Sequence, residues 1–424
     1  MQTTQTTYLL QLSQAVAKTT TLIKSCPMTN FLKNHFQQLD EVLTLTQSLW
    51  KPQPFINDEL PWFQTHPHLK TALLSLGHEE AIALHDDQQL RKNWFSHLEP
   101  ELCNKLFAFN PEPVQVKHEL VFNRFDQQGI SGRKWEQITA FASALPQFDH
   151  PLVDWCAGKG HLSRMVQRNQ QQPVYCLEWD EALVKDGKAL AEKQQLDIRY
   201  YQHNVMQPLP PNCADKNYIH IGLHACGDLH RQLLQQTVKT GAQGTVLSPC
   251  CYHKINTAEY QPFSQAAKNS PLKLTRPCLH LAVQDPVTAR KGERKLRQQE
   301  RIWRLGFDLL QRELRGVNQY LNIPSSNSKL LRKSFYHFCQ WAAAQKNISL
   351  NTTIDYDDFL EKGKEKHQTI LRLELLRRVF NRPIELWLVL DRALYLQEQG
   401  YHVSINQFCD YHISPRNLLI QAQR

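Results

Sequence analysis

The sequence of 424 residues contains no long hydrophobic run: nowhere do about 18 uncharged apolar residues follow one another, the length that a membrane-spanning helix needs. Its first residues, M-Q-T-T-Q-T-T-Y-L-L, lack the basic and apolar regions of a secretory signal peptide. Internal repeats and low-complexity tracts are absent as well. We therefore expect a cytoplasmic protein without a membrane anchor, and its length allows about two or three globular domains.

Paired cysteines are also missing. The eleven cysteines are spread over the whole chain, and no two of them have the C-x-x-C spacing of zinc modules. This pattern excludes a disulfide framework and favours reduced thiols. Cys226, Cys250, Cys251 and His253 come nearest to a metal-ligand set, but adjacent residues rarely point at one tetrahedral ion without local distortion of the backbone. We therefore predict no metal site.

Glycine is sparse, with 15 residues, so two glycines in one short stretch stand out. Residues 152–164 read L-V-D-W-C-A-G-K-G-H-L-S-R and contain both Gly158 and Gly160. The stretch opens with apolar residues typical of a buried parallel strand and ends with the apolar spacing of a helix. Glycine lets the backbone turn tightly and approach a ligand. The order strand, glycine turn, helix predicts a nucleotide-binding loop.

Polar side chains near this loop favour a nucleoside ligand. Asp154 ends the first strand, where a carboxylate can hold a ligand ammonium group. Glu178 ends the next apolar run, twenty residues after Gly158, where it can accept hydrogen bonds from ribose hydroxyls. Asn204 follows a third run and can reach an adenine edge. A dinucleotide site is the alternative, because the loop nearly satisfies G-x-G-x-x-G/A, but a pyrophosphate gains nothing from Asp154.

Four short motifs together resemble one protein family. D-W-C-A-G-K-G-H-L-S-R at 154–164 resembles motif I of the class I S-adenosylmethionine-dependent methyltransferases. L-H-A-C-G-D-L at 223–229, C-C-Y-H-K at 250–254 and S-P-R-N at 414–417 extend the resemblance to the branch that includes the eukaryotic ribosomal RNA adenine dimethylase domain-containing proteins. The resemblance implies S-adenosyl-L-methionine as the cofactor. The expected cofactor-binding residues are Asp154, Ala157, Gly158, Gly160, Glu178, Asn204 and Cys226.

The strand pattern predicts the fold class. Apolar runs alternate with helices from Pro151 to Ser248, which indicates a parallel, doubly wound sheet. Alternation then returns at 401–408 and 418–421, which predicts a terminal antiparallel pair. We expect an α/β, Rossmann-like, seven-stranded methyltransferase sheet with a terminal antiparallel hairpin, an N-terminal helical domain and a large helical insertion. The expected divisions are an N-terminal helical domain at 1–110, a linker at 111–130, the methyltransferase domain at 131–254 and 401–424, and a basic, mainly helical insertion at 255–400.

Reactive side chains follow the fourth and fifth expected strands. Ligands of such sheets bind beyond the carboxyl ends of the strands, so these residues are expected to face the reacting group. A sulfonium cofactor brings its own leaving group, and the enzyme then needs in-line positioning and a group that orients or deprotonates a nitrogen or oxygen nucleophile. The catalytic candidates are Asp228, Cys250, Cys251, Tyr252 and His253.

Three other kinds of function remain open from the sequence. The layout resembles RNA cytosine-C5 methyltransferases, in which Cys226 or Cys250 would attack a pyrimidine ring covalently. A protein or small-molecule amine methyltransferase has the same fold. A nucleic-acid-binding protein that has lost catalysis is a further alternative, and the intact loop with Asp154 and Glu178 argues against it.

The net charge of +9 is concentrated in one segment. Residues 250–340 hold 16 Lys and Arg but 6 Asp and Glu, a net charge of +10. A strongly basic helix is expected at 288–315 within this segment. Basic side chains bind the phosphates of nucleic acids, so we expect RNA or ribosomal material as the partner of this helix. The expected substrate-binding residues are Arg290, Lys291, Arg294 and Lys295.

Overall fold

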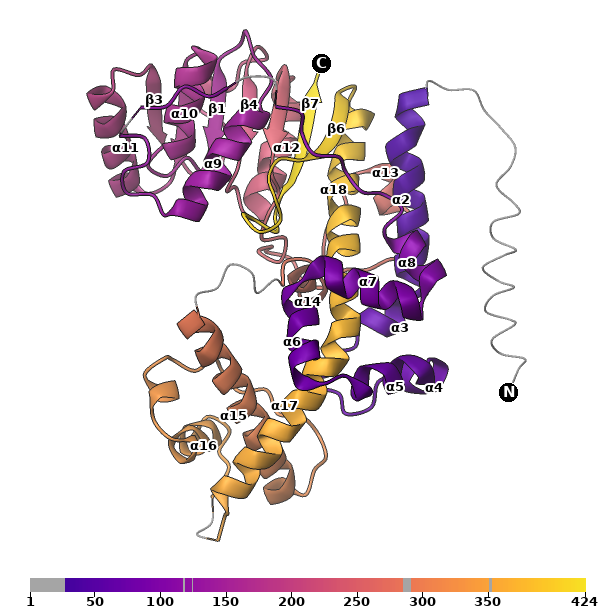
Figure 1. Ribbon diagram of the computed structural model, residues 1–424. Helices are drawn as coiled ribbons and strands as arrows, with labels where there is room; N and C mark the ends of the chain where they lie inside the picture. The colour runs from indigo at the N-terminus through magenta and orange to yellow at the C-terminus, as the bar shows by residue number, and fades with distance from the viewer. Residues whose placement is uncertain (1–26, 117–118, 124, 285–290, 351–352) are drawn as a thin grey trace.

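The computed structural model describes residues 27–116, 119–123, 125–284, 291–350 and 353–424. A seven-stranded sheet lies at one end of the molecule, in the order β3-β2-β1-β4-β5-β7-β6 (Figure 1). Strands β1 to β5 run parallel, whereas β7 runs antiparallel to both β5 and β6. The expected sheet with its terminal antiparallel hairpin is thus confirmed. The strands are β1 (Leu152–Trp155), β2 (Val174–Glu178), β3 (Ile198–Gln202), β4 (Ile219–Gly222), β5 (Gly244–Leu247), β6 (His402–Gln407) and β7 (Leu418–Gln423).

Helices bury both faces of the sheet, so all four residues of β1 are buried, Asp154 included. Successive side chains of a strand point to opposite faces. Leu152 belongs to the hydrophobic cluster on one face, and Val153 and Trp155 belong to the cluster on the other. The first face packs against α9 (Gly132–Ala144), α10 (His161–Gln170) and α11 (Glu181–Lys193). The second face packs against α12 (Asp228–Thr240) and α18 (Asn381–Glu398).

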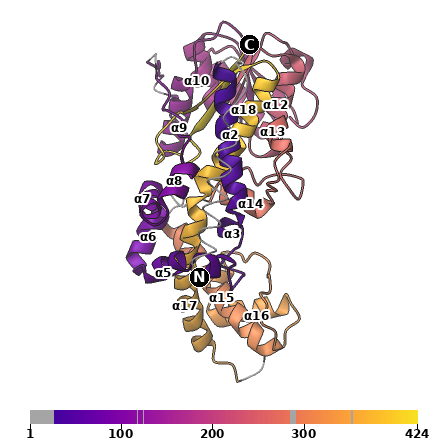
Figure 2. The same ribbon diagram turned by 90° about the vertical axis from the view of Figure 1, so that its right-hand side faces the viewer.

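The N-terminal helices share the second of these clusters and have no separate core. Trp50 is buried in the same cluster as Trp387 of α18 and Val153 of β1. Helices α2 and α18 lie side by side in Figures 1 and 2, and Nε1 of Trp387 donates a hydrogen bond of 2.7 Å to Asp40. Of the expected N-terminal domain at 1–110, residues 1–26 lie outside the described residues. The part from residue 27 onward is mainly helical and packs as one body with the sheet. The helices are α2 (Pro27–Leu45), α3 (Gln47–Trp50), α4 (Trp62–Thr65), α5 (Pro67–Ser75), α6 (His78–Asp86), α7 (Gln88–Leu98) and α8 (Pro100–Leu106).

The segment 111–130, expected to be a linker, begins along the edge of the sheet. The backbone N–H of Val114 donates to the carbonyl of Gln407 at 2.8 Å, and the N–H of Gln407 donates to the carbonyl of Glu112 at 2.9 Å. Further along, the N–H of Val121 donates to Oδ1 of Asn169 in α10 at 2.7 Å. These bonds attach the segment to β6 and to α10, so its path is fixed by the sheet.

The expected insertion 255–400 divides into two parts. Its last helix, α18, covers β6 and β7 and belongs to the layers around the sheet. Helices α15 and α16 and the first half of α17 form a lobe at the other end of the molecule, with a core around Phe307 and Phe338 (Figures 1 and 2). Gly306 and Gly363 allow α15 and α17 to cross closely, since a Cβ on Gly363 would lie 2.8 Å from the backbone nitrogen of Gly306. The helices are α13 (Gln265–Lys268), α14 (Arg276–Leu281), α15 (Lys291–Arg315), α16 (Phe335–Ala344) and α17 (Tyr356–Val379).

None of the helices in the described part of the chain has the length and apolarity needed to cross a membrane. The parallel strands point their carboxyl ends toward the helical lobe, because β5 runs opposite to β7, whose carboxyl end lies at the top of Figure 1. Any ligand bound beyond these ends therefore lies on the side of the sheet that faces the rest of the molecule.

Candidate functional site

The loop after β1 has left-handed backbone at every second residue. The φ angles of Cys156, Gly158 and Gly160 are 58°, 57° and 67°. A side chain at Gly160 is excluded, because its Cβ would lie 1.8 Å from the hydroxyl oxygen of Tyr200. Cys156 adopts a conformation that usually favours glycine. The loop is therefore tightly turned between β1 and α10, as the glycine pattern predicts.

Glu178 holds this loop from the neighbouring strand. Oε2 of Glu178 accepts a hydrogen bond of 2.8 Å from the backbone N–H of Gly158, and Oε1 accepts one of 3.0 Å from the N–H of Asp180. A carboxylate has about four acceptor positions, so both oxygens can accept further hydrogen bonds. The hydrogen bonds therefore fix the orientation of the Glu178 carboxylate, and its oxygens can still accept hydrogen bonds from the hydroxyl groups of a ribose.

Asp154 lies at the end of β1 in a buried environment. Its carboxylate accepts a hydrogen bond from the hydroxyl of Ser163 at the start of α10, and its side chain is almost fully buried. Burial, together with the nearby charge of Glu178, raises the pKa of Asp154 to about 7. A ligand cation beside Asp154 would favour the ionised form, because opposite charges stabilise each other in a buried site.

A cavity of about 710 Å³ opens beyond the carboxyl ends of β1 and β4. Asp154 and the loop that follows it line the cavity together with His224, two residues after the end of β4. The turn between β6 and β7 closes the rim through Ser414, whose hydroxyl accepts a hydrogen bond of 3.2 Å from Gln137 of α9. Its volume is within the range of cavities that bind small ligands.

The mouth of this cavity is basic. Arg133 and Lys134, at the start of α9, line it and are exposed to solvent. His161 also lines the cavity, and burial together with the charges of Arg164 and Lys134 lowers its pKa to about 4. The His161 ring is therefore neutral at pH 7. The positive charges at the mouth attract anions, whereas the His161 imidazole inside the cavity is uncharged.

A second cavity of about 700 Å³ lies beyond β2 and β3. Trp179 lines it and is 69% exposed, so it offers a flat aromatic surface for a base. Asn204 also lines it, and its Oδ1 accepts a hydrogen bond of 3.0 Å from the N–H of Met206, which leaves the amide N–H groups to donate. Glu178 connects the two cavities, since it binds Gly158 of the first and precedes Trp179 of the second.

The two cavities fit the parts of S-adenosyl-L-methionine. In the expected binding mode Asp154 would face the ammonium group and Glu178 the ribose, and Trp179 with Asn204 would face the adenine. These roles stay predictions. The buried carboxylate with its raised pKa is the observation that favours a cationic amino-acid group over a phosphate, because a phosphate beside Asp154 would add a second negative charge.

Residues 133–258 match the model of a family described as a methyltransferase domain. The chain carries a methyltransferase domain. The expected class I fold and S-adenosyl-L-methionine as its cofactor are confirmed for this domain by the family match together with the strand order.

The methyltransferase domain also has structural neighbours of low sequence identity. A geranyl diphosphate methyltransferase in complex with SAM shares 16% identity over 27% of this chain and 49% of that one, with a TM-score of 0.24. TehB from Haemophilus influenzae shares 11% over 29% and 43%, with a TM-score of 0.23. A S-adenosylmethionine-dependent methyltransferase from Clostridium acetobutylicum shares 9% over 29% and 53%, with a TM-score of 0.21. The chain thus spans about half the length of the solved structures that it matches.

The loops after β4 and β5 bring three thiols of the methyltransferase domain together. Sγ of Cys226 lies 3.4 Å from Sγ of Cys250, and with Cys251 the three sulfur atoms lie within 4.8 Å of one another. Hydrogen bonds from Cys226 and Cys250 lower the pKa of the Cys251 thiol. The three cysteines stand beside the cavity rather than on its lining. The cofactor-binding role expected for Cys226 therefore stays a prediction.

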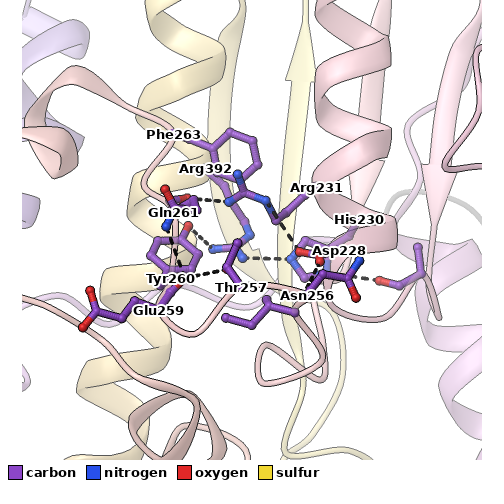
Figure 3. Close-up of polar contacts among 12 residues, drawn as sticks. Asp228, His230, Arg231, Asn256, Thr257, Glu259, Tyr260, Gln261, Phe263 and Arg392 are labelled. Carbon is purple, nitrogen blue, oxygen red and sulfur yellow. Dashed lines mark hydrogen bonds and ion pairs between the residues drawn. The ribbon is translucent and has the colours of Figure 1, made fainter.

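The other catalytic candidates also lie outside the lining of the cavity. Asp228, the first residue of α12, accepts a hydrogen bond of 2.8 Å from the N–H of Asn256 and lies 3.7 Å from Arg231 (Figure 3). Tyr252 is 1% exposed, and the ring of His253 packs edge-on against that of His280 at 5.0 Å. These contacts fix the loops, and the structure does not bring the three side chains to the cavity.

A buried polar network connects the loop after β4 to α18. Figure 3 shows Arg392 pointing toward His230 of α12, with 2.8 Å between Nη2 and Nε2, and toward the hydroxyl of Tyr260 at 3.1 Å. The Tyr260 hydroxyl donates to Asp391 at 2.7 Å. Nδ1 of His230 lies 3.2 Å from the carbonyl of Ala225, the residue before Cys226. The network therefore connects α18 to the loop after β4, which carries Cys226.

The basic helix α15 is partly neutralised by the rest of the molecule. Of its expected RNA-binding residues, Arg290 lies outside the described residues, Lys291 begins the helix, and Arg294 pairs with Asp86 at 3.3 Å. Further along, Arg301 pairs with Glu374 at 2.7 Å, and Arg312 pairs with Asp58 and Asp308. Lys295 and Arg297 remain exposed. The RNA-binding role of α15 stays a prediction, and much of its charge serves to pack the lobe.

The cavity also contains residues that were not expected in it. His224 and Ser414 line it, and both belong to motifs that carry the family resemblance, so a signal for them exists in the sequence. Arg133 and Lys134 have no such signal, because they belong to an ordinary amphipathic helix. Their placement depends on how α9 packs against α10, which no local pattern specifies.

Proposed function

We propose that this protein transfers a methyl group from S-adenosyl-L-methionine to a nitrogen or oxygen atom of an RNA or of a ribonucleoprotein. One arrangement carries the proposal: the cavity has a buried carboxylate, Asp154, at its inner end and the exposed cations Arg133 and Lys134 at its mouth. The inner end suits a cationic cofactor, and the mouth suits a polyanion. A neutral amine or a hydrophobic metabolite would gain nothing from this basic mouth.

Each part of the site has a definite task in this proposal. When bound, the cofactor supplies a methyl group on a sulfonium leaving group, so the chain needs only to bind, orient and exclude water. Asp154 and Glu178 hold the two ends of the cofactor's polar portion. His161 is neutral at pH 7, and its Nδ1 accepts a hydrogen bond of 2.8 Å from Arg164. The proton of the ring is therefore on Nε2, which can donate a hydrogen bond to a substrate oxygen or nitrogen atom inside the cavity. Arg133 and Lys134 bind the phosphates that flank the acceptor.

The motifs at 154–164, 223–229, 250–254 and 414–417 support placement in the branch that includes the ribosomal RNA adenine dimethylase domain-containing proteins. The cytosine-C5 mechanism is less favoured, because Cys226 and Cys250 do not line the cavity and Cys250 is 8% exposed. RNA that contains 5-fluorocytosine separates the two mechanisms, since a cysteine nucleophile would leave a denaturation-resistant adduct. We expect no adduct.

A labelling experiment tests the substrate class. The purified protein is incubated with methyl-labelled S-adenosylmethionine and, separately, with RNA, protein extract and a metabolite pool. We expect label in the RNA with the wild-type protein and a strongly reduced signal with Glu178→Ala. Label in protein or in metabolites would replace RNA by that substrate class and leave the methyltransferase assignment intact. Absence of label from every pool, together with absence of cofactor binding, would contradict the methyltransferase activity itself.

A further inference from the structure

Three thiols from two separate loops converge beside the cofactor cavity. Cys226 follows β4, and Cys250 and Cys251 follow β5. Their sulfur atoms lie within 4.8 Å of one another, and those of Cys226 and Cys250 are 3.4 Å apart. Among the residues that the structure describes, no other three His, Cys, Asp or Glu side chains come together in this way. Buried cysteines in a core usually scatter as small apolar residues, so this convergence needs a cause.

The backbone is shaped to produce this convergence. Adjacent residues in an extended chain point to opposite sides, but Cys251 has a φ of 48°, in the left-handed region that a cysteine rarely adopts. This turn directs Cys250 and Cys251 toward the same place. Two neighbouring cysteines need a local distortion of this kind in order to bind one ion. The sequence alone does not show the distortion, and for that reason it predicts no metal site. Backbone of this kind is typical of functional sites.

The two loops are fastened to each other around the thiols. Cys226 and Cys250 form an isolated parallel bridge beyond the ends of β4 and β5. The N–H of Gly227 donates to the carbonyl of Cys250 at 3.1 Å, and the N–H of Asp228 donates to the carbonyl of Lys254 at 3.0 Å. Gly227 is required for this approach, because a Cβ there would lie 2.0 Å from the carbonyl oxygen of Lys254. The thiols are therefore held in place before any ligand arrives.

We propose that Cys226, Cys250 and Cys251 form a binding site for a thiophilic divalent cation, zinc, with three thiolate ligands and a fourth position left to water or to a substrate atom. Thiolates bind zinc at about 2.3 Å, which in a tetrahedral site places sulfur atoms roughly 3.8 Å apart. The sulfur atoms of Cys226 and Cys250 are 3.4 Å apart, slightly less than this value, and no two of the three sulfur atoms are more than 4.8 Å apart. A zinc ion therefore requires only small movements of the three side chains.

The position of the site gives the ion a role next to the cofactor. The thiol of Cys156, which lines the cofactor cavity, is close enough to Cys226 for their charges to interact. A zinc ion with three protein ligands keeps an open position, as catalytic zinc sites do, whereas structural sites are closed. Bound here, the ion would join the loops of β4 and β5 and would polarise an acceptor atom at the edge of the cavity.

Metal analysis tests the site without any methyl transfer, so its outcome is independent of the proposed function. The full-length protein is purified under reducing conditions with zinc, desalted and analysed by inductively coupled plasma mass spectrometry. We expect about one zinc ion per chain. Cys226→Ser, Cys250→Ser and Cys251→Ser should each lose most of it, while Cys213→Ala and Cys339→Ala, which remove buried cysteines elsewhere, should keep it. Far-UV circular dichroism of each variant shows whether it has folded.

Cobalt supplies a second readout that does not depend on the variants. Co²⁺ in place of zinc should give the thiolate-to-cobalt charge-transfer absorption and the intense visible bands of a tetrahedral, sulfur-rich site. Wild-type protein that holds neither metal after desalting would overturn the proposal. So would a folded Cys226→Ser, Cys250→Ser, Cys251→Ser triple variant that binds as much zinc as the wild type, or a Cys226 to Cys250 disulfide that persists under these reducing conditions.

Discussion

The guanidinium of Arg392 lies 2.8 Å from Nε2 of His230, and both side chains are buried. Arginine can only donate hydrogen bonds, so Nε2 accepts and the proton of the neutral ring is on Nδ1, which donates to the carbonyl of Ala225. Burial and the charge of Arg392 lower the pKa of His230, in agreement with a neutral ring. Helix α18, which comes late in the chain, therefore determines the orientation of the loop that carries Cys226.

Replacing Arg392 by methionine should destabilise the fold strongly. Arg392→Met leaves Nε2 of His230 without its donor and removes a hydrogen bond to Tyr260. Breaking a buried polar network in this way costs about 3 to 5 kcal/mol of unfolding free energy. Urea unfolding at constant m-value measures it. Arg199→Met, on the exposed side of β3, is the control and should change the unfolding free energy by less than about 0.5 kcal/mol. Equal effects of the two substitutions would contradict the role of the network.

Asp154 should make the stability of the ligand-free protein fall as pH rises. Its folded-state pKa is raised to about 7 from an ordinary value near 3.8, so between these values the folded state binds a proton that the unfolded state has lost. Stability therefore decreases from about pH 4 to pH 7 and levels off above it, by as much as about 4 kcal/mol.

Asp154→Asn tests this pH dependence. The variant carries no titrating group at the site. The unfolding free energy of the variant minus that of the wild type should therefore be larger at pH 8 than at pH 5. Urea unfolding at both pH values measures the difference. A difference between the two proteins that does not change with pH would show that Asp154 is already ionised in the folded state at pH 5.

Local patterns in the sequence predict the sheet and the cofactor loop but not how the helices pack. The strand of Leu152 to Trp155 and the left-handed positions at Gly158 and Gly160 follow from residue type alone. The basic helix is different. Asp86, the partner of Arg294, stands 208 residues earlier in the chain, so no pattern within α15 indicates that its charge is neutralised.

The thiol cluster shows the same limit. The sequence places Cys226 and Cys250 after neighbouring strands, which predicts that they lie close together. It does not predict the left-handed turn at Cys251, because that turn comes from the bonds between the two loops and not from the cysteine itself. The expectation of no metal depended on an ordinary backbone at this residue.

Two carboxylates should account for much of the affinity for the cofactor. Glu178→Gln and Asp154→Asn each remove a charged acceptor from the site, which costs about 1.5 to 3 kcal/mol and weakens binding roughly ten- to hundredfold. Isothermal titration calorimetry with S-adenosylmethionine measures the loss. Glu192→Gln, on the exposed side of α11, removes the same charge away from the cavity and should bind as the wild type does. Unchanged binding in both site variants, or tighter binding of NAD, would contradict the cofactor site.

The basic mouth of the cavity should give RNA binding a measurable share of its salt dependence. Each phosphate that a protein neutralises adds about 0.7 to 0.9 to the slope of log affinity against log salt concentration. The double variant Arg133→Gln, Lys134→Gln should therefore flatten the slope by roughly 1 to 2. If α15 also binds RNA, a quadruple variant should flatten it by roughly 2 to 3; its glutamines replace Arg290, Lys291, Arg294 and Lys295.

The control for this experiment removes the same charge at the opposite edge of the sheet. Lys193 and Lys239 are exposed, and they stand in the last turns of α11 and α12, just before β3 and β5 begin. The pair Lys193→Gln and Lys239→Gln thus lowers the net charge by the same amount at the amino ends of the strands, away from both cavities. Because long-range attraction depends on total charge but phosphate contacts depend on position, this pair should leave the slope nearly unchanged. If the slope falls equally in the control pair and in the Arg133, Lys134 pair, RNA binding depends on the net charge alone. If the slope falls in neither pair, RNA does not bind at the mouth of the cavity.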